Sequence, residues 1–210
     1  MQFCKNAFMK QLHYLSGILI SVFTGIHLFN HVCSIAGADK HIEIMQVLRL
    51  FYRNALAETI LLAAVPVQII SGISLCRKKW RATGGWEKLR IWTGLYMGIF
   101  LLVHVTSVLI GRAVLHLDTN FYFGVAGLNT FPFSLFFIPY YGLAVLSFFG
   151  HIAAVHYRKM KCSLSGLSPE NQSKAILFFG ILFTVVIFYG LTNHFRGVTI
   201  PQKYDVLIGK

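Results

Sequence analysis

The stretch Leu12–His31, LHYLSGILISVFTGIHLFNH, decides the fold, because it has the length and composition of a membrane-spanning helix and recurs later in the chain. A constant offset of 77 residues pairs Leu12 with Leu89, Gly17 with Gly94, Phe23 with Phe100 and His27 with His104. Each copy has a glycine near its start and a histidine ten residues later. An ionisable side chain inside lipid is costly, and such a residue is a functional candidate by default.

The composition is that of an integral membrane protein. Of the 210 residues, 56% are hydrophobic and 12% are charged, against about a quarter charged in soluble domains. Continuous apolar runs of the length that crosses a bilayer favour helices over the alternating strands of a barrel. We predict an all-α, up-down bundle in a lipid bilayer, with a four-helix core and an appended fifth helix. The predicted spans are about 14–34, 55–76, 91–111, 132–157 and 173–193.

The composition of the connections between spans also predicts their structure. Residues 37–54 are polar enough to form a loop or an interfacial helix, and 112–131 form a long outer loop. Ser168 followed by Pro169 is typical of a helix N-terminus, with serine as the cap. The chain shows one domain and no separate soluble region.

The net charge of +12 does not indicate nucleic-acid binding, because lysine and arginine lie in short connections between apolar runs. They are more abundant in the N-terminal segment and in the second and fourth connections, which include 77–90 and 158–161, than in the other three segments. By the positive-inside rule, the N-terminus is expected in the cytoplasm and the C-terminus outside.

His27 and His104 are expected at the same depth, because each lies seven residues before the outer end of a span running in the same direction. That places both about 10 Å inside the membrane at the helical rise of 1.5 Å. Two imidazoles facing each other in a bundle suit bis-histidine ligation of haem b. Zinc or copper is less favoured, because a further ligand at that depth is needed and only His31, one turn away, is near.

The number of spans, the histidine placement and the Gly–His pattern give the chain a resemblance to the membrane-anchor cytochrome b subunits of succinate dehydrogenase and fumarate reductase. The resemblance covers about residues 12–157. It implies one or two haems b beside a quinone site, a redox partner subunit, and a role as an anchor or electron-transfer subunit. With the basic N-terminus it also implies the bacterial cytoplasmic (inner) membrane.

In two-haem members of that family, the first and third core helices hold one haem and the second and fourth hold the other. His27 and His104 match the first pair, whereas Gln68 and His151 stand where the second pair is expected. Glutamine is a poor haem ligand, so we expect at most one haem. The alternative for Gln68 and His151 is a mutual hydrogen bond that satisfies two buried polar groups.

Polar residues near the outer ends of the spans suggest further sites. Asn30, His31 and Glu58 form a candidate proton-accepting quinone pocket. The alternative is an interfacial polar cluster in which Glu58 pairs with Arg53 or Arg49. Arg53 and Arg112 are candidates to pair with haem propionates, or are ordinary membrane-edge anchors.

The remaining histidines and the cofactor motifs that the sequence lacks leave an alternative hypothesis open. His13, His41, His156 and His194 fall near predicted interfaces and are expected to face water. The chain has no flavin or nicotinamide fingerprint and no iron–sulfur cysteine set, so it is at most the membrane subunit of a quinone-linked oxidoreductase. The alternative is a cofactor-free helical membrane protein, such as a small transporter, scaffold or assembly factor.

Overall fold

The computed structural model describes residues 2–77 and 84–210. Within these ranges the chain is helical, with no β-strand. The elements are α1 (Gln2–Val32), η1 (Cys33–Ala36), α2 (Ala38–Tyr52), α3 (Ala55–Arg77), α4 (Gly85–Ala113), α5 (Phe121–Val125), α6 (Ser134–Lys159), α7 (Pro169–Leu191) and η2 (Gln202–Ile208). Residues 78–83 of the basic connection 77–90 lie outside the described residues.

In the described part of the chain, five helices are long and apolar enough to cross a membrane. They are α1, α3, α4, α6 and α7, and they overlap the five predicted spans. The prediction of an all-α integral membrane protein is therefore confirmed. Helix α1 begins at Gln2, well before the predicted start of the first span, so His13 lies within the helix.

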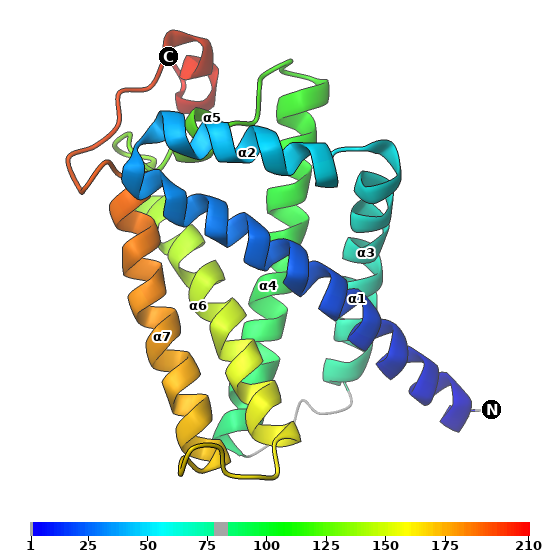
Figure 1. The fold of residues 1–210 in the computed structure, drawn as a ribbon. Helices are drawn as coiled ribbons and strands as arrows, with labels where there is room; N and C mark the ends of the chain where they lie inside the picture. The colour runs from blue at the N-terminus through cyan, green and yellow to red at the C-terminus, as the bar shows by residue number, and fades with distance from the viewer. Residues whose placement is uncertain (1, 78–83) are drawn as a thin grey trace.

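The membrane helices form a closed ring in chain order. Helix α1 packs against α3 on one side and α7 on the other, α4 lies between α3 and α6, and α6 packs against α7. Figure 1 shows α1 running diagonally with respect to the other four helices. Because the neighbours of α1 are α3 and α7, it faces α4 and α6 across the centre of the ring.

One end of the ring, the expected outer end, is covered by short helices. The predicted interfacial segment forms α2, which lies across this end and contacts η1, α1 and α5 (Figure 1). Helix α5 lies within the predicted outer loop, and the Asn120 side chain caps it by accepting from Tyr122 N at 3.0 Å. The Tyr204 hydroxyl donates to the Asp118 carbonyl at 3.0 Å, so η2 is held against the same loop.

The apolar core lies beneath these short helices. Its buried members come from α1, the α5 region, α6 and α7: Leu28, Phe121, Val125, Leu128, Val145, Ile187 and Leu191. At the opposite end, the Ser168 hydroxyl accepts from Asn171 N at 3.3 Å and Pro169 occupies the first position of α7, as predicted. The apolar core therefore fills one end of the helix ring. The centre of the ring is not filled by this core.

Candidate functional site

The centre of the ring is a cavity of about 2280 Å³. Its walls are mainly aliphatic and aromatic side chains of α1, α3, α4 and α6, and α7 adds Ile187 and Leu191. Pockets for one small molecule are typically about 300–1,000 Å³. The cavity therefore has room for more than one ligand of that size.

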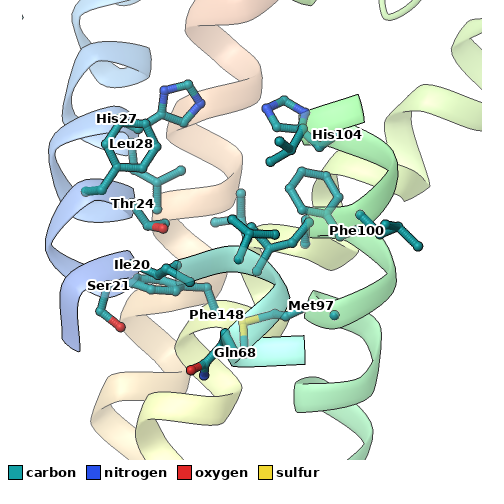
Figure 2. Close-up of a pocket in the computed structure, with 18 of the residues that line it drawn as sticks. Ile20, Ser21, Thr24, His27, Leu28, Gln68, Met97, Phe100, His104 and Phe148 are labelled. Atoms are coloured by element: carbon teal, nitrogen blue, oxygen red, sulfur yellow. The ribbon is translucent and has the colours of Figure 1, made fainter. Parts of the chain in front are cut away.

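The structure brings His27 and His104 together across this cavity. Figure 2 shows the two rings at one level on opposite walls, His27 from α1 and His104 from α4. Their centroids are 6.2 Å apart, with 62° between the ring planes. Phe23 stacks on His27 and Phe100 stacks on His104, at centroid distances of 5.8 and 5.0 Å. The sequence repeat thus delivers two matched Phe–His pairs.

The separation of the two rings fits ligation of one iron from opposite sides. Metal–nitrogen bonds of about 2 Å, plus roughly 1 Å from each nitrogen to its ring centre, give centroids about 6 Å apart. Within the described residues the His104 imidazole has no hydrogen-bond partner, although it faces the cavity. His27 Nε2 lies 3.1 Å from His31 Nε2, so a ligand bound through that atom replaces this hydrogen bond.

A polar cluster continues from the histidine pair toward the outer end. His31 Nδ1 lies 3.3 Å from His41 Nε2, and Asn30 Nδ2 lies 3.1 Å from the same nitrogen. His41 is 3% exposed, so the expectation that it faces water is wrong: α2 folds inward over the cavity and buries it. In the part of the chain that is described, His41 Nδ1 and Asn30 Oδ1 are buried without a hydrogen-bond partner.

Burial of His41 gives the outer cluster a pH dependence. Burial, followed by repulsion from His27 and Arg49, lowers the pKa of His41 to about 4. Between this value and the usual pKa of about 6.5, the unfolded chain binds more protons, so folding stability falls as pH falls through that window. We expect the difference in thermal unfolding temperature between wild type and His41→Gln to narrow from pH 7 to pH 4. A difference in unfolding temperature between wild type and His41→Gln that does not change with pH would contradict the assignment.

Glu58 is held by Arg112, not by Arg49 or Arg53. The Arg112 guanidinium donates to both carboxylate oxygens of Glu58 and joins α4 to α3 at the outer mouth of the cavity. Arg49 instead pairs with Asp118 at 2.8 Å. Glu58 therefore lines the same cavity as Asn30 and His31 but belongs to a separate ion pair.

Arg53 also lines the cavity mouth, between α2 and α3. Burial lowers the pKa of Arg53, and the positive charges of Arg49 and Arg112 act in the same direction. Across the described ranges, its guanidinium forms no hydrogen bond or salt bridge. Arg53 is thus the arginine at this mouth most available to an anionic group.

Gln68 and His151 do not form the expected mutual hydrogen bond. Gln68 Oε1 accepts from the Ser16 hydroxyl at 2.6 Å, which joins α3 to α1. His151 Nδ1 donates to the Arg90 carbonyl at 3.1 Å, which joins α6 to α4. The order of helices in the ring explains the difference, because α3 and α6 are not neighbours and each residue bonds to the adjacent helix.

His13 is a cavity residue that the sequence analysis missed. It was expected to face water, but it lines the cavity, and its Nδ1 lies 3.1 Å from Ser71 Oγ of α3. His156 is also held within the bundle, where its Nε2 bonds to Gln172 Oε1 at 2.8 Å. The half-buried His194 contacts the Ile35 carbonyl through its Nε2 at 3.1 Å. The signal for His13 was its position fourteen residues before His27, on nearly the same helix face.

In the described residues, no group of three or more His, Cys, Asp or Glu is arranged to hold a metal ion. The two histidines that lie opposite each other across the cavity are His27 and His104. Comparison of the chain with family models, with curated proteins and with solved structures gives no match.

Proposed function

We propose that this integral membrane protein binds haem b between His27 and His104 and takes part in quinone-linked electron transfer, as an anchor or electron-transfer subunit. The observation that carries the proposal is the 6.2 Å separation of two imidazoles on opposite walls of the central cavity. The resemblance to the succinate dehydrogenase and fumarate reductase cytochrome b anchors supports the same function. Haem b supplies a one-electron carrier within the membrane when bound.

The protein's own side chains have distinct roles in this proposal. His27 and His104 would hold the haem iron, and the Phe23 and Phe100 rings stacked on them restrict their orientation. Arg53 and Arg112 lie at the outer mouth, where guanidinium groups suit propionate carboxylates. Since Arg112 is already paired with Glu58, Arg53 is the first candidate for this contact.

A quinone site is proposed beside the haem at the outer end of the cavity. Asn30 and His31 present an amide and an imidazole close to His27, and Glu58 supplies a carboxylate on the neighbouring helix α3. Quinone reduction consumes protons together with electrons, so groups that donate hydrogen bonds and carry protons suit this position.

The proposed location is the bacterial cytoplasmic membrane, with the N-terminus inside. The two termini lie toward opposite ends of the bundle (Figure 1). Arg158 and Lys159 end α6 and Lys161 follows it, on the side away from the covering helix α2. The excess of positive charge on that side supports its assignment to the cytoplasm.

The hydrogen bond between His27 and His31 favours a second candidate, a cofactor-free membrane protein. In that interpretation His27 is already satisfied by a neighbour one turn along α1. The two functions differ in their tolerance of substitution. An amide side chain at position 27 can keep the hydrogen bond to His31, whereas amides at positions 27 and 104 cannot replace imidazole as haem ligands.

The test is the reduced-minus-oxidised absorbance spectrum of the full chain, purified in detergent from cells supplied with haem. The proposal predicts the sharp band of six-coordinate haem b, together with at least one haem per chain. A colourless, folded protein from such cells would contradict the proposal and favour the cofactor-free alternative.

A further inference from the structure

The inner mouth of the cavity, at the end opposite the covering helix α2, is lined by basic side chains. Lys10 comes from α1, and Arg158 and Lys159 come from the last turn of α6. These three residues form the inner basic cluster. Among the described residues that line the cavity, the single acid is Glu58, which lies at the outer mouth. The inner mouth is therefore positively charged.

The acids at this end of the bundle do not neutralise the inner basic cluster. Among the described residues they are Glu87 and Glu170, and each forms a salt bridge within its own helix. The three cations of the cluster form no salt bridge with any described residue. An anionic ligand would therefore meet positive charges that are not already paired.

A cation–π contact brings the cluster together from two helices. Lys159 Nζ lies 4.2 Å from the centroid of the Tyr14 ring, so the end of α6 contacts α1 at the inner mouth. Lys10 precedes Tyr14 by one helical turn and lies on the same face of α1. Positive charges from two helices thus meet around one aromatic ring. Their mutual repulsion opposes this arrangement, and a bound anion would relieve it.

An apolar strip of α1 leads from this cluster into the cavity. Tyr14, Ile18 and Val22 line the cavity at intervals of four residues, and they are 52%, 46% and 59% exposed. Ile73 of α3 and Ile152 of α6 line the inner half as well. Accessible apolar surface of this kind, bordered by polar residues, is typical of a site for an apolar ligand or for lipid.

The length of the inner half matches one leaflet of a bilayer. The segment from Tyr14 to His27 rises about 20 Å along the tilted helix α1, and the hydrocarbon of one leaflet is about 15 Å thick. Gln68, His13 and His151 line this half, and each already hydrogen-bonds to an adjacent helix. The inner half can therefore accept an acyl chain below the level of the proposed haem.

We propose that the inner basic cluster binds the phosphate group of an anionic phospholipid from the inner leaflet, with one acyl chain along the apolar strip of α1. Lysine and arginine are the side chains that bind phosphate, and basic pockets between membrane helices suit anionic lipid headgroups. The apolar strip favours a lipid over free phosphate. This site lies apart from the His27–His104 level and does not depend on haem.

The test is native mass spectrometry of the full chain, purified in mild detergent and titrated with dioleoyl phosphatidylglycerol. One lipid should bind per chain, and more tightly than dioleoyl phosphatidylcholine, whose headgroup has no net charge. Each cation near the membrane surface contributes roughly a factor of five to the binding of anionic lipid. The double variant Lys10→Gln plus Arg158→Gln should therefore bind phosphatidylglycerol about 25-fold more weakly. Both positions are exposed, so the substitutions leave the packing intact.

The matched control is the double variant Lys88→Gln plus Lys161→Gln. It removes the same charge from the same end of the bundle, and neither lysine lines the cavity. This control should keep the affinity of wild type. Equal weakening in the two double variants would show a general attraction of lipid to a basic surface and would overturn the proposed site.

A second measurement tests the acyl chain. Dihexanoyl phosphatidylglycerol has the same headgroup and should bind more weakly, because its short chains cover less of the apolar strip. Equal affinities of the two lipids, or displacement of the long-chain lipid by inorganic phosphate, would show a simple anion site and overturn the proposal.

The lipid titration includes no measurement of haem, so the two proposals can fail separately. A colourless protein that binds the anionic lipid through this cluster would contradict the proposed function and support the lipid site. A haem-containing protein without preference for the anionic lipid would overturn the lipid site alone.

Discussion

Replacing either His27 or His104 with glycine should remove the haem proposed between them, and added imidazole should restore it. In the proposed site each of the two rings, whose centroids are 6.2 Å apart, would supply one nitrogen to the haem iron. The expected result is complete loss of the six-coordinate spectrum of that haem in each variant. Free imidazole can enter the space left by the side chain and take its place on the iron.

The matched control is His116→Asn, since His116 is an exposed histidine in the loop after α4. Asparagine tolerates its positive φ of 53° better than most residues. This variant should keep the full spectrum. Retention of this haem in His104→Gly without imidazole would contradict the role of His104 as a ligand. Loss that imidazole cannot reverse would indicate a structural role for the histidine.

Gly190→Ala should destabilise the bundle strongly, because α7 approaches η1 most closely at this residue. A Cβ atom there would lie 2.3 Å from Ser34 Oγ and 2.9 Å from the Ile35 backbone nitrogen. Backbone cannot rotate away as a side chain can, so the helix must shift. Overpacking of this kind costs about 1–3 kcal/mol. The measurement is the thermal unfolding temperature in detergent, which should fall clearly below that of wild type.

Gly98→Ala is the control for that prediction. Gly98 lies in α4, and a Cβ atom there meets nothing within 4 Å. Alanine is about 1 kcal/mol better than glycine in a helix interior, so the variant should equal or exceed wild type in stability. Equal stabilities of Gly190→Ala and Gly98→Ala would contradict the close packing of α7 against η1.

The repeat made the fold and the principal histidine pair predictable. Five apolar runs gave the spans, and the offset shared by His27 and His104 predicted equal depth in two parallel helices. The structure adds that these helices face each other across a cavity and are not neighbours. The depth of a residue in the membrane follows from its position along a helix. The depths of His27 and His104 could therefore be predicted without knowing how the helices pack.

The inner part of the site could not be predicted, because it depends on which helices are neighbours. Gln68 and His151 lie at similar depths, but the ring places Ser16 beside the first and the Arg90 carbonyl beside the second. His13 was assigned to water because the first span was expected to start at Tyr14, whereas α1 begins at Gln2. His41 was missed because nothing in residues 37–54 shows that α2 folds over the cavity.

The most direct test of the central claim is the near-infrared magnetic circular dichroism of the oxidised, purified protein, since these bands identify the axial ligands of low-spin ferric haem. Ligation by His27 and His104 predicts the bands of paired imidazoles, and their loss in His27→Gly and in His104→Gly. A spectrum with one imidazole and a different second ligand, or a wild-type spectrum that survives both substitutions, would contradict the account.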